Sequence, residues 1–337
     1  MTVREIAKKA GCSTATVSRV INDLPGVGPE MRERVKKILH ECNYSVNGTI
    51  RAAVEQKSCV LLFAYEDDIN NYFYDELVRG AIDCAETGGH LLLFNSFRNN
   101  FTMDYFLSLI KSGKIDGVIV SSASSAVSTR FVNAVSALEC PLVLIDSPVD
   151  NCNAPLISID NEHAGYTATQ YLIQKGHKKI GHISGVQKSH TGFYRWMGYV
   201  HAMRDAGLYS YAAMHSVSGG YTRKLAEKAT YELLGSNDRP TAVFAANDMM
   251  AFGVYDAVRK MKLRIPEDVS VIGIDDNLGA QQIRPTLTTL KQPTYEIGYK
   301  GVEVALRLLN GAENVLEKSI ILPTRIEERD SVLAIGH

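Results

Sequence analysis

The chain has 337 residues, of which 45% are hydrophobic and 22% are charged, and its formal net charge is −1. This composition is typical of a globular protein long enough to form two or more domains. The sequence has no apolar run of about 18 residues and no apolar stretch at its start, which predicts a cytoplasmic protein with no membrane span and no secretory signal.

The charge is unevenly distributed along the chain. Residues 1–57 contain ten Lys or Arg and six Asp or Glu, whereas the rest of the chain contains 26 Lys or Arg and 31 Asp or Glu. A small basic segment on a mildly acidic body favours a polyanionic partner for the first segment, although a solvated basic surface would look the same. The six cysteines are scattered without a Cys-x-x-Cys pair, which indicates reduced thiols and neither disulfides nor zinc ligands.

The first forty residues predict three short helices. Thr2 and Glu5 form a capping box for the first helix, which ends at Gly11. Ser13 is a suitable N-cap for the second helix, and Pro29 opens the third. The apolar side chains at helical spacing, which should form the core, are Val3, Ile6, Ala7, Ala10, Val17, Val20, Ile21, Met31, Val35, Ile38 and Leu39. Two helices joined by a glycine turn and braced by a third form a helix-turn-helix.

The outward face of the second helix is made of small polar residues and one arginine. Short hydroxyl side chains let a helix approach phosphates closely, and Arg19 can present two donors to a guanine. Ala15 could touch a thymine methyl group. Any small helical bundle could carry a similar surface, but the cap, the turn and the basic charge together favour double-stranded DNA as the partner.

The segments "TVREIAKKAGCSTATVSRVIND" and "VKKILHECNY" closely resemble the N-terminal signature of the lactose/galactose repressor family of bacterial transcription regulators. The resemblance implies a helix-turn-helix DNA-binding domain over residues 1–46. It also implies roles for individual side chains in this domain. Those expected to read bases are Thr14, Ala15 and Arg19, and those expected to hold phosphates are Thr2, Ser13, Thr16, Ser18 and Asn22.

Residues 47–58 correspond to the hinge of that family, whose helix orders on operator DNA and inserts a leucine into the minor groove. This chain keeps Asn47, but Ile50 replaces the usual alanine and Ala53 replaces the leucine wedge. Gly48 and Thr49 are also weak helix formers. The resemblance therefore implies a hinge with reduced ability to bend DNA, and a flexible linker is the alternative.

From residue 59 onward, short apolar runs alternate with helical stretches. The runs "CVLLFA", "HLLLF", "GVIV", "PLVLI", "LISI", "KKIGHIS", "AVFAA" and "VSVIGID" predict buried parallel strands, too many for one sheet. We therefore expect an α/β fold with two lobes, as in periplasmic-binding-protein-like modules, with effector binding and dimerisation in residues 59–337. The predicted boundaries are 59–160 with 291–322 for lobe 1, and 161–290 with 323–337 for lobe 2.

Ligands in such folds bind beyond the carboxyl ends of the strands, in the cleft between lobes. Motifs over about residues 60–330, among them "QKGHKKIGHISG" and "IPEDVSVIGIDD", extend the family resemblance and imply a set of effector-binding residues. These are Phe73, Ser121, Arg195, Tyr221, Asn247 and Asp275. Alternatives remain for each, since Arg195 and Asp275 could pair with each other, the two aromatic residues could be core, and Ser121 could cap a helix.

No His-Glu-x-x-His motif, Gly-x-Ser-x-Gly elbow, P-loop or Gly-x-Gly-x-x-Gly occurs, which argues against an enzyme, and we expect neither cofactor nor metal. The sequence predicts a dimeric, ligand-responsive transcription regulator that binds operator DNA, most simply a repressor controlled by a sugar or sugar acid. A nucleobase-type corepressor is the main alternative. A solute-binding protein without DNA binding and a sugar-processing α/β enzyme are further ones.

Overall fold

The computed structural model describes residues 3–21, 25–41, 59–65, 73–96, 100–121, 126–186, 188–311 and 318–336. The chain divides into two units, Met1–Ser58 and Cys59–His337, and each is described by itself. Five residues to which a role was assigned lie outside the described residues, namely Thr2, Asn22, Asn47, Ile50 and Ala53. Their predicted roles at the DNA and in the hinge remain predictions.

The first unit contains three helices: α1 (Val3–Ala10), α2 (Thr14–Ile21) and α3 (Pro29–Glu41). Gly11, with φ of +69°, makes the turn between α1 and α2. The helices pack around a small core whose fully or nearly buried members are Ile6, Ala7, Ala10, Val17, Val20 and Val35. The apolar spacing that predicted three helices therefore also identified much of the buried face of this unit.

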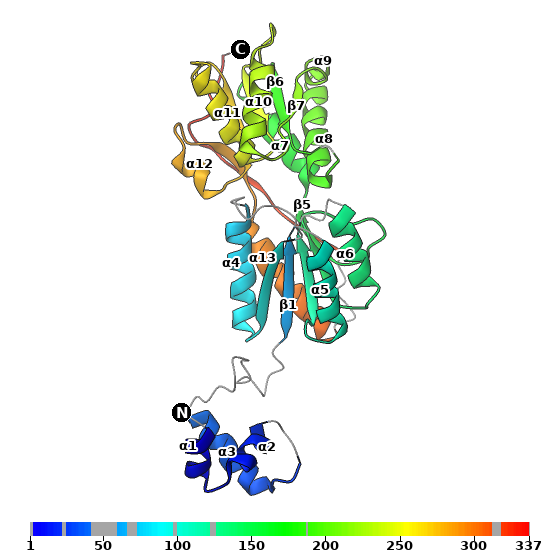
Figure 1. The fold of residues 1–337 in the computed structure, drawn as a ribbon. Helices are drawn as coiled ribbons and strands as arrows, with labels where there is room; N and C mark the ends of the chain where they lie inside the picture. Colours follow the sequence, from blue (N-terminus) through cyan, green and yellow to red (C-terminus); the bar gives the residue numbers. More distant parts are fainter. Residues whose placement is uncertain are drawn as a thin grey trace. The chain divides into compact units, whose positions relative to one another are not determined.

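The second unit begins with a six-stranded, fully parallel sheet, which we call lobe 1 (Figure 1). In sheet order its strands are β11 (Ser319–Leu322), β5 (Leu156–Ile159), β4 (Leu142–Ile145), β3 (Gly117–Ser121), β1 (Val60–Tyr65) and β2 (Leu91–Ser96). One face is covered by α4 (Phe73–Thr87) and α13 (Thr294–Leu309), the other by α5 (Asn100–Lys111) and α6 (Ala126–Ser136). Both faces of the sheet are buried, which explains why its strands are continuous apolar runs in the sequence.

Lobe 2 has the same plan with one antiparallel edge. In sheet order its strands are β12 (Arg325–Glu327), β10 (Thr288–Lys291), β9 (Ser270–Asp275), β8 (Ala242–Ala245), β6 (Ile180–Ser184) and β7 (Ser216–Ser218). The helices α7 (Asn161–Gln174) and α8 (His190–Asp205) cover one face, and α10 (Arg223–Leu234) and α11 (Asp248–Lys260) cover the other. Two short helices complete it, α9 (Tyr209–Ala212) and α12 (Leu278–Gln282).

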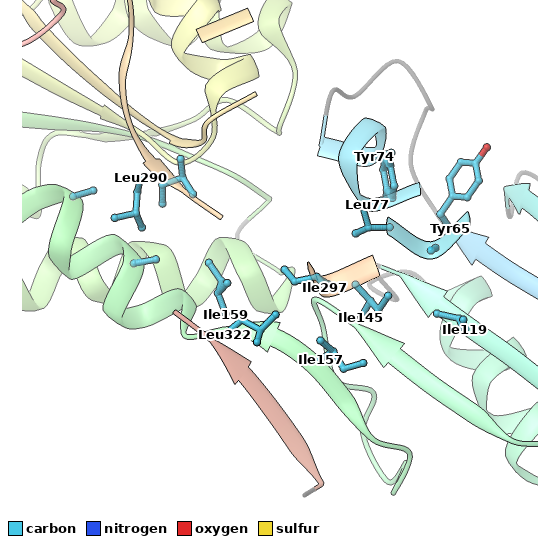
Figure 2. Packing of buried hydrophobic residues seen from close by; sticks show 14 of the residues in the cluster. Tyr65, Tyr74, Leu77, Ile119, Ile145, Ile157, Ile159, Leu290, Ile297 and Leu322 are labelled. Atoms are coloured by element: carbon cyan, nitrogen blue, oxygen red, sulfur yellow. The ribbon is translucent and has the colours of Figure 1, made fainter. Parts of the chain in front are cut away.

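The chain passes between the lobes three times, after β5, β10 and β11. Ile159, Leu290 and Leu322 are buried close to these crossings and belong to one hydrophobic cluster that continues into both lobes (Figure 2). Because parallel strands end at the same edge of a sheet, the carboxyl ends of β3, β4 and β9 face the region between the lobes. The predicted α/β fold with parallel sheets is confirmed, and this edge is where the site residues lie.

Among the described residues, no helix is long and apolar enough to span a membrane. The five cysteines within them are free thiols.

Candidate DNA-contacting helix and effector cleft

The second helix of the first unit is capped by its own hydroxyl residues. Ser13 Oγ accepts a hydrogen bond from the backbone N–H of Thr16 at 3.0 Å, and the two hydroxyl oxygens are 2.9 Å apart. This fixes the start of α2 and explains why a helix so poor in charge forms there. The predicted base-reading and neighbouring side chains on its open face are exposed: Thr14, Ala15, Ser18 and Arg19.

Arg19 lies beside the turn that follows α2. A Cβ built on Gly26, which has φ of +97°, would be 3.6 Å from Arg19 Nη1, so the guanidinium lies close to the backbone of this turn. Arg19 as a whole is exposed. An arginine in this place has the reach and the paired donors to read a base edge.

Arg195 is a buried cation of the second unit that is held by two hydrogen bonds. It is 3% exposed, its Nε donates to Asn161 Oδ1 at 2.9 Å, and its Nη1 donates to the backbone carbonyl of Ala246 at 2.6 Å. Asn161 is the first residue of α7, and a Cβ on Gly165 would come within 2.1 Å of the Arg195 carbonyl oxygen. The glycine therefore lets α7 and α8 approach closely enough to bring the amide and the guanidinium together.

Asp275 ends β9 and is 6% exposed. Its Oδ1 accepts a hydrogen bond from Gln292 Nε2 at 2.7 Å. Burial raises the pKa of Asp275 to about 6, while the positive charge of Arg195 opposes this and the negative charge of Asp146 adds to it. The three groups therefore act on one another at a single place, although Arg195 and Asp275 form no ion pair among the described contacts.

Tyr221 lies on the same site with a φ of +60°. Its ring covers the backbone of Gly185, where a Cβ would be 2.2 Å from Tyr221 Cζ. The hydroxyl is buried without a hydrogen-bond partner among the described residues, and the hydroxyl of the nearby Ser189 donates to the Val186 carbonyl at 2.7 Å. Burial raises the pKa of Tyr221 to about 12, against the effect of Arg195.

Asp146 and Thr191 were not identified from the sequence. Asp146 follows β4 in lobe 1, and its Oδ2 accepts a hydrogen bond at 2.9 Å from Thr191 Oγ1 in the first turn of α8 in lobe 2. Ser147 Oγ is 3.3 Å from Thr191 Oγ1. Asp146 directly follows a buried strand, so the expectation that ligands bind beyond the carboxyl ends of strands points to it, whereas Asp275 was assigned from the family resemblance.

The other three predicted effector residues have distinct positions. Ser121 ends β3, next to Ile145 of β4, and its buried hydroxyl has no partner among the described residues. Asn247 is buried, but its Oδ1 caps α11 by accepting from the Met250 N–H at 2.9 Å. Phe73 opens α4 and packs on the lobe 1 core, edge-on to Tyr74 with ring centroids 5.4 Å apart. Ser121 thus lies beside the strand end that precedes Asp146, whereas Asn247 and Phe73 have evident structural roles as well.

The turn after Asp275 is tied to the crossings between the lobes. The buried carboxylate of Asp276 accepts from Lys291 Nζ at 2.9 Å, at the end of β10, and from Arg329 Nη2 beyond β12. Lys291 directly precedes the segment that crosses to lobe 1, and Arg329 follows β12, the strand that the chain forms on its return to lobe 2. This turn therefore carries Asp275 next to Asp276, the acid that binds Lys291 and Arg329.

A second buried acid, Asp248, holds the same turn through hydrogen bonds. Asp248 accepts from Thr289 Oγ1 at 2.6 Å and from the Asn277 N–H at 3.1 Å. Burial, together with the charge of Asp275, raises the pKa of Asp248 well above its usual range. Because both oxygens are bonded inside the protein, Asp248 orients the turn and does not face the cleft.

The site thus brings together one cation, two acids and unpartnered neutral groups. A guanidinium only donates and a carboxylate only accepts, which suits a ligand with several hydroxyls. Among the described residues, no group of three or more His, Cys, Asp or Glu could hold a metal ion.

Comparison with known proteins identifies both parts of the chain. Residues 2–47 match the model of bacterial regulatory proteins of the lacI family, and residues 169–332 match a periplasmic binding protein-like domain. Catabolite control protein A of Priestia megaterium is 33% identical over 98% of this chain and 99% of its own length. The transcriptional repressor PurR of Pectobacterium carotovorum is 31% identical over 97% and 96%.

Two solved structures resemble this chain over 98% and 99% of its length. A complex of the transcriptional regulator CelR with cellobiose has a TM-score of 0.74 at 27% identity and covers 98% of this chain and 99% of its own. The lac repressor dimer bound to operator and an anti-inducer has a TM-score of 0.79 and covers 99% of both chains; at 24% identity it supports the fold. The relatives are transcription regulators and not enzymes, and this chain belongs to the lacI family of bacterial regulatory proteins.

Proposed function

We propose that this protein is a cytoplasmic, dimeric repressor that binds operator DNA through α2 and responds to a polyhydroxylated, sugar-type effector in the cleft between the two lobes of the second unit. In this proposal Arg19, with Thr14 and Ala15, reads bases, and Ser13, Thr16 and Ser18 hold phosphates. Two copies on a two-fold axis would recognise a near-palindromic operator.

The single observation that carries the effector site is the convergence of Arg195 and Asp275, both nearly buried and of opposite hydrogen-bonding character, beside the unpartnered hydroxyl of Tyr221. Buried polar groups without a hydrogen-bond partner are rare in folded proteins because they cost free energy. A ligand that forms hydrogen bonds with them removes this cost. Asp146 and Ser121 supply the matching groups from lobe 1.

Closure of the lobes is the means by which such a ligand can act on DNA binding. Thr191 and Asp146 already join the lobes, and Asp276 holds the crossings beside the ligand-facing acid. A ligand that contacts both lobes favours their closed arrangement to the extent that the ligand binds the closed arrangement more tightly than the open one.

A thermal-shift screen of sugars, sugar acids, amino sugars and nucleobases tests the proposal. The only tryptophan of the chain, Trp196, is adjacent to Arg195 and gives a second readout by fluorescence. We expect a sugar-type compound to stabilise the wild type and Arg204→Ala, an exposed change on the same helix, but not Arg195→Ala. Equal stabilisation of Arg195→Ala would contradict the assigned site, and selective binding of a nucleobase would contradict the effector class.

A further inference from the structure

The C-terminal end of α11 borders a pocket that is separate from the effector site. The helix begins at Asp248, which accepts a hydrogen bond from Asn277 in the turn after Asp275, and ends at Lys260. Its 13 residues span about 18 Å at a rise of 1.5 Å per residue, so its two ends belong to different surfaces. A cavity of about 250 Å³ lies at the C-terminal end, between the last turns of α11, the loop that follows it and the segment after α12. We call this cavity the α11 pocket.

The buried part of the lining of the α11 pocket is apolar. Tyr255 and Val258 of α11 are each 2% exposed, and Leu263, Ile265 and Pro285 are half-buried. The Tyr255 hydroxyl donates to the backbone carbonyl of Pro285 at 3.1 Å, which joins α11 to the segment after α12. The pocket can therefore accept an apolar group of a ligand.

The charged residues that line the α11 pocket are all cations. Arg259 lies in the last turn of α11, Lys262 follows this helix, and Arg284 comes from the segment after α12; all three are exposed. No acid is among the described residues of the lining. Cations near a helix C-terminus can simply offset the helix dipole, but Arg284 belongs to another segment, so the dipole does not account for the whole set.

These three cations retain donors for a ligand. The side chains of Arg259 and Lys262 form no hydrogen bond or ion pair with the described part of the chain, although the charge of Arg259 acts on Asp256. Arg284 donates through Nη1 to the carbonyls of residues 281–283, which fixes its guanidinium and leaves Nε and Nη2 open. An anion in the pocket could therefore receive N–H bonds from separate segments at once.

The acids on neighbouring positions are bonded to other cations. Asp256 accepts two hydrogen bonds from Arg223, at 2.6 and 2.8 Å. Asp268 accepts from Nε and Nη2 of Arg264, at 2.9 and 3.2 Å. Glu267 is exposed and does not line the pocket. The positive charge of the pocket is thus not neutralised by a carboxylate of its own lining.

From this arrangement we propose that the α11 pocket is a second ligand site, which binds a small organic phosphate. The phosphate bonds to Arg259, Lys262 and Arg284, and the organic part rests on the apolar lining. A phosphate monoester carries about two negative charges at pH 7, and its oxygens match guanidinium donors. A volume of about 250 Å³ restricts the ligand to a small molecule. The site is independent of the proposed effector cleft.

Titration calorimetry of the full-length protein with phenyl phosphate tests the charged part of the site. We expect the double variant Arg259→Gln, Lys262→Gln to bind phenyl phosphate at least about ten-fold more weakly than the wild type, because it loses two charged donors. The matched control Lys224→Gln, Lys228→Gln removes two exposed charges from α10, outside the pocket, and should bind as the wild type does. Thermal denaturation checks that both variants fold, as the exposure of all four side chains predicts.

Two further comparisons locate the site and test its apolar part. Arg195→Ala should bind phenyl phosphate as the wild type does, because Arg195 belongs to the effector cleft. Inorganic phosphate and phenol should each bind more weakly than phenyl phosphate, since each lacks one half of the ligand. The inference would be overturned by equal weakening in the two double variants, by loss of binding in Arg195→Ala, by inorganic phosphate or phenol binding as tightly as phenyl phosphate, or by no binding to the wild type at millimolar concentrations.

Discussion

Thr191 Oγ1, at the start of α8 in lobe 2, donates a hydrogen bond to Asp146 Oδ2, at the end of β4 in lobe 1, over 2.9 Å. This bond joins two segments that are 45 residues apart in sequence and belong to different sheets. It places a lobe-to-lobe contact at Asp146, one of the two acids of the proposed effector site. The two lobes are therefore in contact at this point.

Removing this contact should weaken effector binding. A hydrogen bond to a charged group contributes about 1.5–3 kcal/mol, so Thr191→Val should reduce affinity for the ligand found in the screen by about ten-fold or more. Thr230→Val is the matched control, because Thr230 is also buried in lobe 2 and its hydroxyl donates to the carbonyl of Ala226 in its own helix. Trp196 fluorescence titrations measure both variants, and equal affinities would show that the contact does not support binding.

Asp275 should reduce the stability of the ligand-free protein at neutral pH. Its pKa of about 6 in the folded state lies above the ordinary 3.8, so the folded state binds more protons between about pH 4 and 6 and loses stability as pH rises through this window. Asp275→Asn should therefore stabilise the protein above pH 7, by up to about 3 kcal/mol. It should make little difference below pH 4, where the carboxyl is protonated in both states.

Urea unfolding at pH 4.5 and pH 8 tests the sign of this effect. Asp256→Asn in α11 is a control of opposite sign, because the paired Arg223 lowers the pKa of Asp256. That variant should lose stability at pH 8. A loss of stability at pH 8 in Asp275→Asn as well would show that the folded protein stabilises the carboxylate of Asp275, which is incompatible with a raised pKa.

Arg19 should determine operator specificity. Arg19→Ala is expected to weaken operator binding by about 1–3 kcal/mol and binding to random DNA much less. Arg34→Ala removes the same charge from the exposed surface of α3 and should affect both DNAs alike. Fluorescence anisotropy with labelled duplexes at fixed salt measures all four affinities. If Arg19→Ala reduced both affinities equally, Arg19 would be a phosphate contact.

The hinge should bend DNA less than a leucine-bearing hinge does. The methyl group of Ala53 is too short to part a base step, and unstacking a step costs a few kcal/mol that only a wedge offsets. Ala53→Leu should then increase both the bend and the affinity. Energy transfer across a doubly labelled operator measures the bend, and a sharp central kink with the wild type would contradict this prediction and make Ile50 the first candidate wedge.

Sequence patterns predicted the parts of this protein that depend on local spacing. The buried positions Ile6, Val17 and Val35 follow from helical periodicity, and continuous apolar runs predicted strands such as β3 and β9. The short strands β7 and β12 were not predicted, because three-residue segments carry too little pattern. Their positions depend on the neighbouring strands with which they pair.

The candidate site was predicted only in part. Asp275 and Arg195 came from motifs, but the approach of Asn161 to Arg195 depends on how closely α7 and α8 pack at Gly165, which no local pattern reveals. The sequence also left open whether the effector is a sugar or a sugar acid. That choice depends on which charged and polar groups meet at the site, and this is a property of the tertiary structure.

The most direct test of the effector cleft is the effect of ligand on operator affinity in the wild type, Arg195→Ala and Arg204→Ala. We expect the ligand to change operator affinity of the wild type and of Arg204→Ala equally. Arg195→Ala should bind operator as the ligand-free wild type does and should not respond to ligand. If Arg195→Ala still changed its operator affinity with ligand as the wild type does, the cleft around Arg195 and Asp275 would not be the effector site.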